Sequence, residues 1–305
     1  MKVALVLKGD IRAVAQFHNA FRELRDALPG CEFPLLESRS PGHALALARE
    51  ACGDTDYLIA VGGDGTVNEV LNGAMTAGGK VPTLGILAYG TANDLVRTLG
   101  LQGDVTELIG LLARDARQWV DVGNLQYRDA DGEAHQRWFL NAADVGIGAE
   151  VVRHLANRRH FIGSTLHYLR SIVGSLRSYR HRNLHIRTDR GLDWQGRSLA
   201  LVAGNGRYFG AGLCVAPGAR MDDGELFVTL VGNATTWDFM RNLGRLKRGR
   251  LLEHPEASYH QACHISVEHE GDAARVEADG ELLGFTPVEI DIRPRAVELL
   301  MPEPA

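Results

Sequence analysis

Hydrophobic positions follow two different patterns along the chain. In the first part, short uninterrupted apolar runs such as Val3 to Leu7 and Leu58 to Val61 alternate with stretches at helical spacing, such as Val14 to Leu28. Uninterrupted apolar runs are typical of parallel strands covered on both faces, and the spacing between them predicts helices. A last helix is expected at Leu101 to Arg114. This part therefore predicts an α/β domain with a parallel sheet.

The pattern changes near residue 122. From there the chain favours short alternating strands, and Asp-Gly pairs at Asp223-Gly224 and Asp279-Gly280 indicate tight turns between them. We therefore expect an α/β domain at 1–122 and a β-rich domain at 123–294. The alternating tail at 295–305 is expected to pack back on the first domain.

A glycine-rich turn follows the apolar run at Leu58 to Val61. Gly62, Gly63, Asp64, Gly65 and Thr66 come directly after this predicted strand. Thr66 and Glu69 have the spacing of a capping box, which predicts a helix N-terminus immediately after the glycines. Free N–H groups and the helix dipole would then point into a loop without side-chain bulk, where phosphate oxygens bind well. A nucleotide is the ligand that this arrangement favours.

Asp64 changes the interpretation of this loop. A carboxylate among phosphate-binding groups repels the ligand unless the site needs a divalent cation or a proton acceptor. A phosphoryl-transfer site satisfies both conditions. The alternative is an ordinary strand-to-helix turn in which Asp-Gly is present for its backbone geometry.

The same arrangement occurs a second time at residues 82–94. Here a predicted strand leads into Gly90, Thr91, Asn93 and Asp94, and Thr91 and Asp94 repeat the spacing of threonine and acid. A second capped helix would then begin at the carboxyl end of a second strand, where open α/β sheets bind their ligands.

Composition restricts the class of protein further. The chain has 305 residues, 45% hydrophobic and 23% charged, with a formal net charge of -5. These values indicate a globular protein, and attraction to polyanions must come from local patches. The N-terminus has too much charge for a signal peptide and no apolar run reaches the length of a membrane span, so we expect a cytoplasmic protein. The four cysteines lack metal or disulfide spacing.

Two segments are locally basic. Between Val151 and Thr188 no acid occurs, while arginines alternate with apolar residues; a second cluster extends from Arg241 to Arg250. Segments 153–187 and 241–250 are expected to contact an anionic membrane surface transiently. The alternative is a packed helix with solvated arginines. No nucleic-acid-binding motif accompanies the charge.

The two glycine motifs together resemble those of the diacylglycerol kinase catalytic-domain family, in particular its bacterial lipid kinases of the YegS type. The resemblance covers nearly the whole chain, although Lys8-Gly9-Asp10 stands where the family has a phosphate turn. It implies the fold shared by NAD kinases and diacylglycerol kinases, in which residues 1–122 would bind the nucleotide and a β-sandwich at 123–294 would bind the lipid substrate. It also implies an ATP-dependent lipid kinase, with a lipid hydroxyl as acceptor and Mg²⁺ as cofactor.

The resemblance also implies roles for individual residues. ATP would contact Ser38, Gly62, Gly63, Asp64, Gly65, Thr66, Asn68, Glu69, Gly90, Thr91, Asn93 and Asp94. For Ser38 a solvated turn is an equal alternative. A Mg²⁺ that shapes a loop would bind the Asp223 carboxylate and the carbonyl groups of Arg220 and Glu225. Glu281, assisted by Asp279, would accept the proton of the lipid hydroxyl, and Asp64 is the alternative base.

Other functions remain alternatives at this point. An NAD kinase-like enzyme shares part of the first glycine motif, and a lipid-binding regulator without turnover would keep the fold. A dinucleotide oxidoreductase is disfavoured because Gly-x-Gly-x-x-Gly is missing. The sequence does not identify the lipid among diacylglycerol, phosphatidylglycerol and sphingoid bases. Exposed strand edges in the second domain are compatible with a homodimer.

Overall fold

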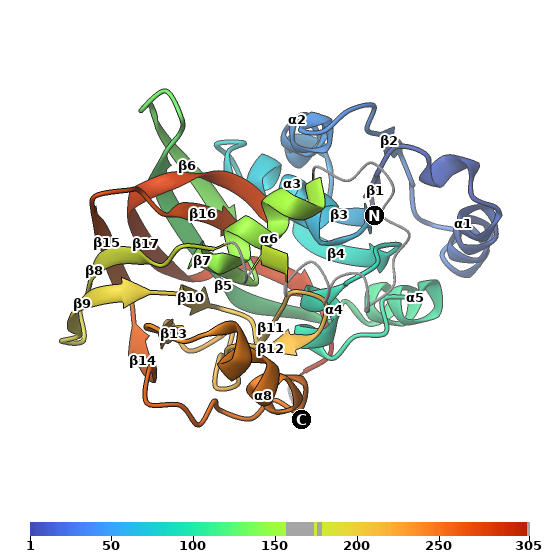
Figure 1. Ribbon diagram of the computed structural model, residues 1–305. Helices are drawn as coiled ribbons and strands as arrows, with labels where there is room; N and C mark the ends of the chain where they lie inside the picture. The colour runs from blue at the N-terminus through green and yellow to red at the C-terminus, as the bar shows by residue number, and fades with distance from the viewer. Residues whose placement is uncertain (157–173, 176–178, 304–305) are drawn as a thin grey trace. The chain divides into compact units, whose positions relative to one another are not determined.

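The computed structural model describes residues 1–156, 174–175 and 179–303. The chain forms two compact units, one made of Met1–Val120 with Arg295–Ala305 and one made of Asp121–Pro294. The boundary lies close to the one expected after residue 122. Figure 1 shows the course of the chain and the elements of each unit.

The first unit contains a parallel sheet in the strand order β2-β1-β3-β4, with the end of β17 beside β4. Its strands are β1 (Val3–Leu7), β2 (Leu35–Glu37), β3 (Tyr57–Gly62) and β4 (Thr83–Ala88). Its helices are α1 (Ala15–Ala27), α2 (His43–Ala51), α3 (Asp64–Met75), α4 (Asp94–Leu99) and α5 (Val105–Arg114), with short 3₁₀ helices at Ile11–Ala13 and Cys52–Asp54.

Both faces of the central strands are covered, as the uninterrupted apolar runs predict. Every residue of β1 and β3 is buried. On one face, side chains of β1 and β3 share a core with Phe17 of α1 and Leu108 of α5. Helices α2 and α3 pack against each other and contact β1 and β3, respectively. The α/β prediction for this part of the chain is confirmed.

The order of the strands determines where a ligand can bind in the first unit. The chain runs from β1 to β2 on one side and then returns to β3 on the other side of β1. Open parallel sheets bind ligands outside the carboxyl ends of their strands, where this order reverses. The loops after Leu7 and Gly62 lie at that edge, and the loop after Ala88 follows on the neighbouring strand.

The second unit is mainly antiparallel. Its strands are β5 (Arg117–Arg128), β6 (Ala134–Phe139), β7 (Ala142–Gly146), β8 (Arg182–Thr188), β9 (Asp193–Ser198), β10 (Ala200–Gly204), β11 (Tyr208–Phe209), β12 (Leu213–Cys214), β13 (Leu226–Val231), β14 (Ala257–Ala262), β15 (His264–Glu270), β16 (Arg275–Ala278) and β17 (Glu281–Leu300). Its helices include α6 (Ile147–Ala156) and α8 (Thr236–Lys247).

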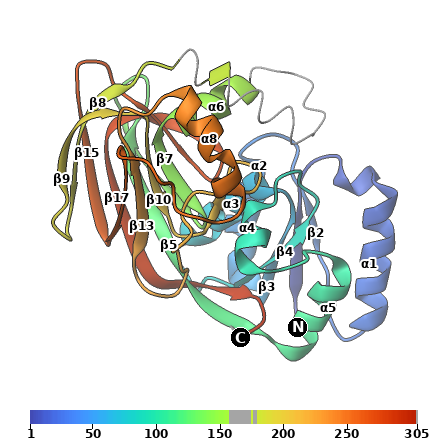
Figure 2. The ribbon, with the colours of Figure 1, turned by 60° about the horizontal axis from the view of Figure 1, so that its bottom comes forward.

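Strand alternation gives this unit two apolar regions. Inward-facing residues of β7, β10 and β13 meet those of β8, β15 and β17 in one core, which is the interior of a β-sandwich. The alternate residues of β7, β10 and β13 point away from that core, and α6 and α8 lie on their side (Figure 2). The mainly β prediction for the second domain is therefore confirmed.

None of the helices in the described part of the chain is long and apolar enough to cross a membrane. Most of the basic segment 153–187, including Arg158, Arg159, Arg170 and Arg177, lies outside the described residues.

Candidate functional site

The two glycine loops of the first unit lie directly against one another. The Tyr89 N–H donates to the carbonyl of Gly62 at 2.7 Å. A Cβ on Gly63 would lie 2.9 Å from the Cα of Gly90, and a Cβ on Gly90 would lie 2.4 Å from the Cα of Gly63. Real Cβ atoms do not approach backbone so closely. Both positions therefore require glycine, and together they bring the two loops into contact in one compact surface at the carboxyl ends of β3 and β4.

Asp64 lies at this surface as the first residue of α3 and is partly exposed. Its Oδ1 atom accepts a hydrogen bond of 3.3 Å from the N–H of Leu95, in the first turn of α4. The carboxylate thus connects the starts of the two helices that follow the glycine loops. Gly65 is the second residue of α3, in the same turn.

The capping box predicted for Thr66 and Glu69 is wrong. Helix α3 already begins at Asp64, with Gly63 as its N-cap and no side-chain cap, so Thr66 lies within the first turn. The Thr66 side chain occupies the space where a Cβ on Gly62 would lie, 2.3 Å from its Oγ1. The Glu69 carboxylate instead accepts two 3.0 Å bonds from backbone N–H groups at the start of α2, those of Gly42 and Ala44.

The second predicted cap, at Thr91 and Asp94, is also wrong. Helix α4 begins at Asp94, and its N-cap Asn93 has a left-handed backbone and no side-chain cap. The Asn93 amide donates to the Gly90 carbonyl at 3.1 Å, which holds the glycine turn. Asp94 is buried and forms a 2.7 Å ion pair with Arg97. Thr91 is exposed.

Two other predicted nucleotide contacts hold the loops together. The Ser38 Oγ accepts a 3.1 Å hydrogen bond from the Gly9 N–H, so Ser38 anchors the turn that follows β1. Its side chain is buried rather than solvated. Asn68 is buried within α3, where it accepts from the Asn72 amide at 3.0 Å. These contacts do not test whether either residue binds a nucleotide.

In the second unit, Asp279 and Gly280 form the turn between β16 and β17. Both have positive φ, 48° and 83°, as a two-residue hairpin of type I′ requires. The Asp279 carboxylate accepts hydrogen bonds of 2.9–3.1 Å from three successive backbone N–H groups, those of Leu140, Asn141 and Ala142. Asp279 therefore fixes the hairpin to the loop between β6 and β7.

Glu281 follows this turn and forms an ion pair with Arg137 of β6. Both side chains are largely shielded from solvent, with 30% and 15% exposure. The Arg137 guanidinium therefore fixes the orientation of the Glu281 carboxylate, which the family resemblance implies is the base. Asp64 belongs to the first unit, whereas Asp279 and Glu281 belong to the second.

The predicted metal-binding loop lies before β13. Asp223 accepts from the Glu225 N–H at 3.1 Å, and Glu225 forms an ion pair with Arg190. Burial raises the pKa of Asp223, and the nearby Asp121 carboxylate raises it further. Asp121 is fully buried and accepts from the Gly224 N–H at 2.7 Å.

These residues fit a hard cation in one respect, because two acids lie close together where a cation would relieve their repulsion. Among the described residues, no three His, Cys, Asp or Glu side chains form a cluster that could hold a metal ion. A cation here would therefore need backbone carbonyls, such as those of Arg220 and Glu225.

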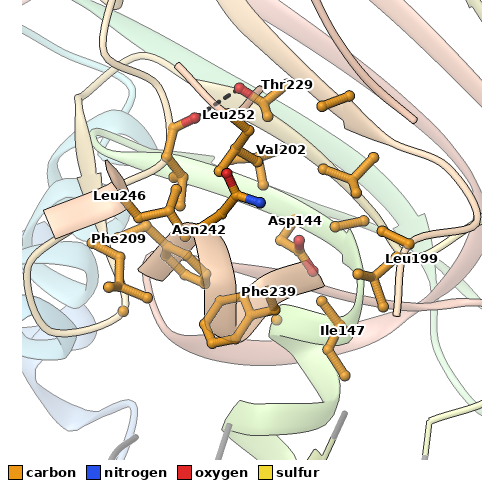
Figure 3. Close-up of a pocket in the computed structure, with 18 of the residues that line it drawn as sticks. Asp144, Ile147, Leu199, Val202, Phe209, Thr229, Phe239, Asn242, Leu246 and Leu252 are labelled. Atoms are coloured by element: carbon orange, nitrogen blue, oxygen red, sulfur yellow. Dashed lines mark hydrogen bonds between the residues drawn. The ribbon is translucent and has the colours of Figure 1, made fainter. Parts of the chain in front are cut away.

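An apolar pocket of the second unit was not predicted from the sequence. It lies between α6, α8 and the outward-facing residues of β7, β10 and β13, and its volume is about 130 Å³. Figure 3 shows Leu199, Val202 and Phe239 among the side chains around it. Asn242 and Thr229 are polar members of the lining, but each has a hydrogen-bond partner in the protein, Asp238 and Val215, respectively.

Asp144 brings a carboxyl group to this pocket (Figure 3). It is 1% exposed, and its Oδ2 accepts a 3.2 Å bond from the Ala149 N–H at the start of α6. Gly148 gives the carboxyl room, because a Cβ there would lie 2.7 Å from Oδ2. Burial raises the pKa of Asp144 to about 7, although hydrogen bonds from α6 lower it.

Glu277 lies opposite Asp144 on the neighbouring strand β16. It is fully buried, and burial, followed by the charge of Asp144, raises its pKa well above the ordinary value. Its Oε2 accepts from the Gly280 N–H at 2.8 Å, whereas Oε1 has no partner within the described structure. The sequence signal for this pair is an acid between two apolar residues, Ala143 and Val145 around Asp144 and Val276 and Ala278 around Glu277.

Comparison with known proteins identifies the family. The model of the diacylglycerol kinase catalytic domain matches residues 12–125, and that of the YegS C-terminal NAD kinase β-sandwich-like domain matches residues 141–301.

Individual relatives agree with these matches. A Pseudomonas aeruginosa protein named "Probable lipid kinase YegS-like" is 30% identical over 308 residues, covering 99% of this chain and 94% of its own. A diacylglycerol kinase of Staphylococcus haemolyticus is 28% identical, covering 82% of this chain and 72% of its own. The crystal structure of a diacylglycerol kinase from Bacillus anthracis has the same fold, with a TM-score of 0.71, 22% identity and coverage of 99% and 97%. The chain thus belongs to the diacylglycerol kinase catalytic-domain family, with the YegS-like lipid kinases, and is a kinase.

Proposed function

We propose that the chain transfers the γ-phosphate of ATP to a hydroxyl group of a lipid such as diacylglycerol, phosphatidylglycerol or a sphingoid base. The apolar pocket of the second unit carries the lipid part of this proposal. Its volume of about 130 Å³ is close to that of engineered apolar cavities that stay dry and bind benzene. Part of an acyl or alkyl chain therefore suits it, whereas the ribose of NAD does not.

The glycine loops of the first unit supply the phosphate side of the reaction. Gly63 and Gly90 let the loops touch. The first bond of α3 is donated by the Thr66 N–H to the Gly63 carbonyl at 2.9 Å, so the N–H groups of Asp64 and Gly65 precede the hydrogen-bonded part of the helix. Phosphate oxygens can accept from such groups, which also stabilise the charge on the transferring phosphoryl group. Asp64 would hold the Mg²⁺ that accompanies ATP. When bound, this ion neutralises charge that develops on the phosphate oxygens.

The lipid hydroxyl needs a group that accepts its proton. We assign this role to Glu281, whose ion pair with Arg137 fixes the carboxylate in one orientation. Asp279 supports it by holding the hairpin, since three backbone N–H groups already bind its carboxylate. Asp64 is the alternative base. Loss of the proton from the hydroxyl as phosphate transfers leaves a phosphomonoester and ADP.

A second Mg²⁺ would bind at the loop before β13. Asp223 would ligate it through its carboxylate, and Arg220 and Glu225 through their backbone carbonyls. The Asp121 carboxylate near Asp223 supports a cation there, because burial and, after it, repulsion from Asp121 raise the pKa of Asp223, and a cation would offset that repulsion. Its role would be to hold the loop in shape.

The test is transfer of labelled phosphate from ATP to a panel of lipids that differ in headgroup, with NAD as a competing acceptor. We expect one class of lipid to become labelled and NAD to remain unlabelled. Labelling of NAD would support an NAD kinase-like enzyme instead. Lipid binding without transfer to any lipid of the panel would support a regulator without turnover.

A further inference from the structure

Helix α8 has two faces of different character. Its inner face contributes Phe239, Asn242 and Leu246 to the apolar pocket, and Figure 3 shows these three side chains among the lining. Leu243 packs against the same apolar side, so the opposite side of the helix is its outer face. Trp237 and Met240 lie on that outer face, with 68% and 43% of their surface exposed.

The apolar part of the outer face is unusual for this chain. In the described part, seven large hydrophobic side chains are exposed, and Trp237 is the most exposed of them. Trp237 and Met240 stand three residues apart, so they are neighbours on the helix surface. Leu251, shortly after the helix, is 47% exposed. A tryptophan with its ring in solvent is typical of a surface that meets a partner or a membrane interface.

Basic residues follow Trp237 and Met240 in the sequence. Residues 236–251 contain five basic residues and one acid, Asp238. Asp238 is part of the helix cap, where it accepts from the Thr235 N–H at 2.9 Å. Arg245 pairs with Glu253. The other four cations, Arg241, Lys247, Arg248 and Arg250, are exposed and have no ion pair among the described residues.

Helical spacing places two of these cations on the same face as the tryptophan. Arg241 lies four residues after Trp237, and Arg248 lies seven residues after Arg241, so they follow the same stripe. Gly244, between them, would have nothing within 4 Å of an added Cβ, which agrees with an open face. The stripe is therefore apolar at its N-terminal end and basic at its C-terminal end.

We propose that the outer face of α8 docks on an anionic lipid bilayer, with Trp237 and Met240 inserted at the interface and Arg241, Lys247 and Arg248 against the headgroups. Charge complementarity selects this occupant: the chain carries a net charge of -5, yet this segment is basic. The opposite face of α8 lines the pocket. Docking of α8 on the bilayer would therefore bring the membrane lipids close to the pocket. This inference builds on the proposed lipid kinase function, but binding to vesicles is measurable without turnover.

The test measures binding to phosphatidylglycerol-containing vesicles by co-sedimentation, with phosphatidylcholine vesicles alone for comparison and without ATP. We expect preference for the anionic vesicles that weakens at high salt. Trp237→Ser with Met240→Ser should reduce the partition coefficient at least tenfold. Each surface cation is worth about a fivefold change, so Arg241→Gln, Lys247→Gln and Arg248→Gln together should also reduce it at least tenfold.

The chain offers matched controls for both variants. Trp119 is 52% exposed in the first unit, so Trp119→Ser tests for a general effect of an exposed tryptophan. Arg22, Lys80 and Arg114 are exposed there and form no ion pair with any residue that the structure describes, so their change to glutamine removes the same charge. We expect these controls to bind as the unmodified chain does.

Several results would overturn the proposal. They are equal binding to both kinds of vesicle, a loss of binding in the controls as large as in the α8 variants, or unchanged binding when Trp237 and Met240 are replaced. All α8 variants should still phosphorylate a short-chain lipid dispersed in detergent. If neither the unmodified chain nor any variant phosphorylates this lipid, the kinase proposal fails. If vesicle binding then still follows our expectation, the docking proposal stands.

Discussion

The glycine loops of the first unit and the apolar pocket of the second unit are built in opposite ways. The loops bring two short segments together through backbone contact, since Gly63 and Gly90 leave no room for a Cβ. The pocket collects single side chains from strands and helices between Asp144 and Ala257. A phosphate group is recognised through backbone N–H groups, whereas an apolar chain is recognised through side-chain surface. The phosphate-binding loops can therefore be recognised from a local sequence motif, whereas the apolar pocket cannot.

The largest expected effect lies in the loops. Asp64→Asn should reduce phosphate transfer by about a thousandfold, because the neutral amide would hold Mg²⁺ poorly and the charge on the phosphate oxygens would lose its stabilisation. The fold should remain intact, because the asparagine Oδ1 can still accept from the Leu95 N–H. Labelled-ATP transfer and a thermal unfolding curve measure the two effects. Asp26→Asn, at an exposed position of α1, is the control. Unimpaired turnover in Asp64→Asn would remove this residue from the site.

Replacing Asp144 in the pocket should change the stability of the fold rather than the binding of phosphate by the loops. The pKa of Asp144 is about 7 in the folded protein, above its ordinary value of 3.8, so the folded state keeps a proton that the unfolded state loses. The free energy of unfolding should therefore fall as pH rises from about 4 to 7, by roughly 1.4 kcal/mol per pH unit and about 4 kcal/mol in total, and then level off.

Asp144→Asn should remove the part of this slope that comes from Asp144. Glu277 adds a slope of the same sign, because its pKa is raised as well, and it remains in the variant. Tyr179, whose pKa burial and Asp144 raise, does not titrate in this range. Denaturant unfolding of both proteins at a series of pH values measures the difference. Identical slopes in the two proteins would show that Asp144 is ionised in the fold.

Contact between the loops can be broken directly. Gly90→Ala places a Cβ against the Gly63 backbone and should destabilise the first unit by about 1–3 kcal/mol, as overpacking does. It should also weaken ATP binding, because the loops must separate. Gly79→Ala is the control, since nothing lies within 4 Å of a Cβ there. Calorimetric unfolding and ATP titration compare the two variants, and equal effects would contradict the loop contact.

A smaller effect is expected from filling the pocket. Val231, the last residue of β13, lines the pocket together with residues of α8. Val231→Phe should raise KM for a long-chain lipid about tenfold, which is 1.4 kcal/mol, and leave KM for ATP unchanged. Steady-state kinetics with each substrate varied in turn separates the two values. A parallel rise in both, or in neither, would place the lipid elsewhere.

More of the glycine loops than of the apolar pocket can be predicted from the sequence. The strand at Leu58 to Val61 and the glycine turn after it were predicted because burial and tight turns are local properties. The helix starts were misplaced because Gly63 and Asn93 serve as N-caps without a side-chain bond, and Glu69 turns to α2, a contact 25–27 residues away. Asp144 and Glu277 were missed because only strand pairing brings them together.

The most direct test of the central claim uses two photoactivatable analogues, an ATP analogue and a lipid with the reactive group on its acyl chain, followed by peptide mass spectrometry. We expect the ATP analogue to label the loops at Gly62–Asp64 or Gly90–Asp94. We expect the lipid to label β10 or α8, and Val231→Phe to suppress the lipid label alone. Lipid labelling confined to the first unit, or unaffected by Val231→Phe, would contradict lipid binding in the pocket of the second unit.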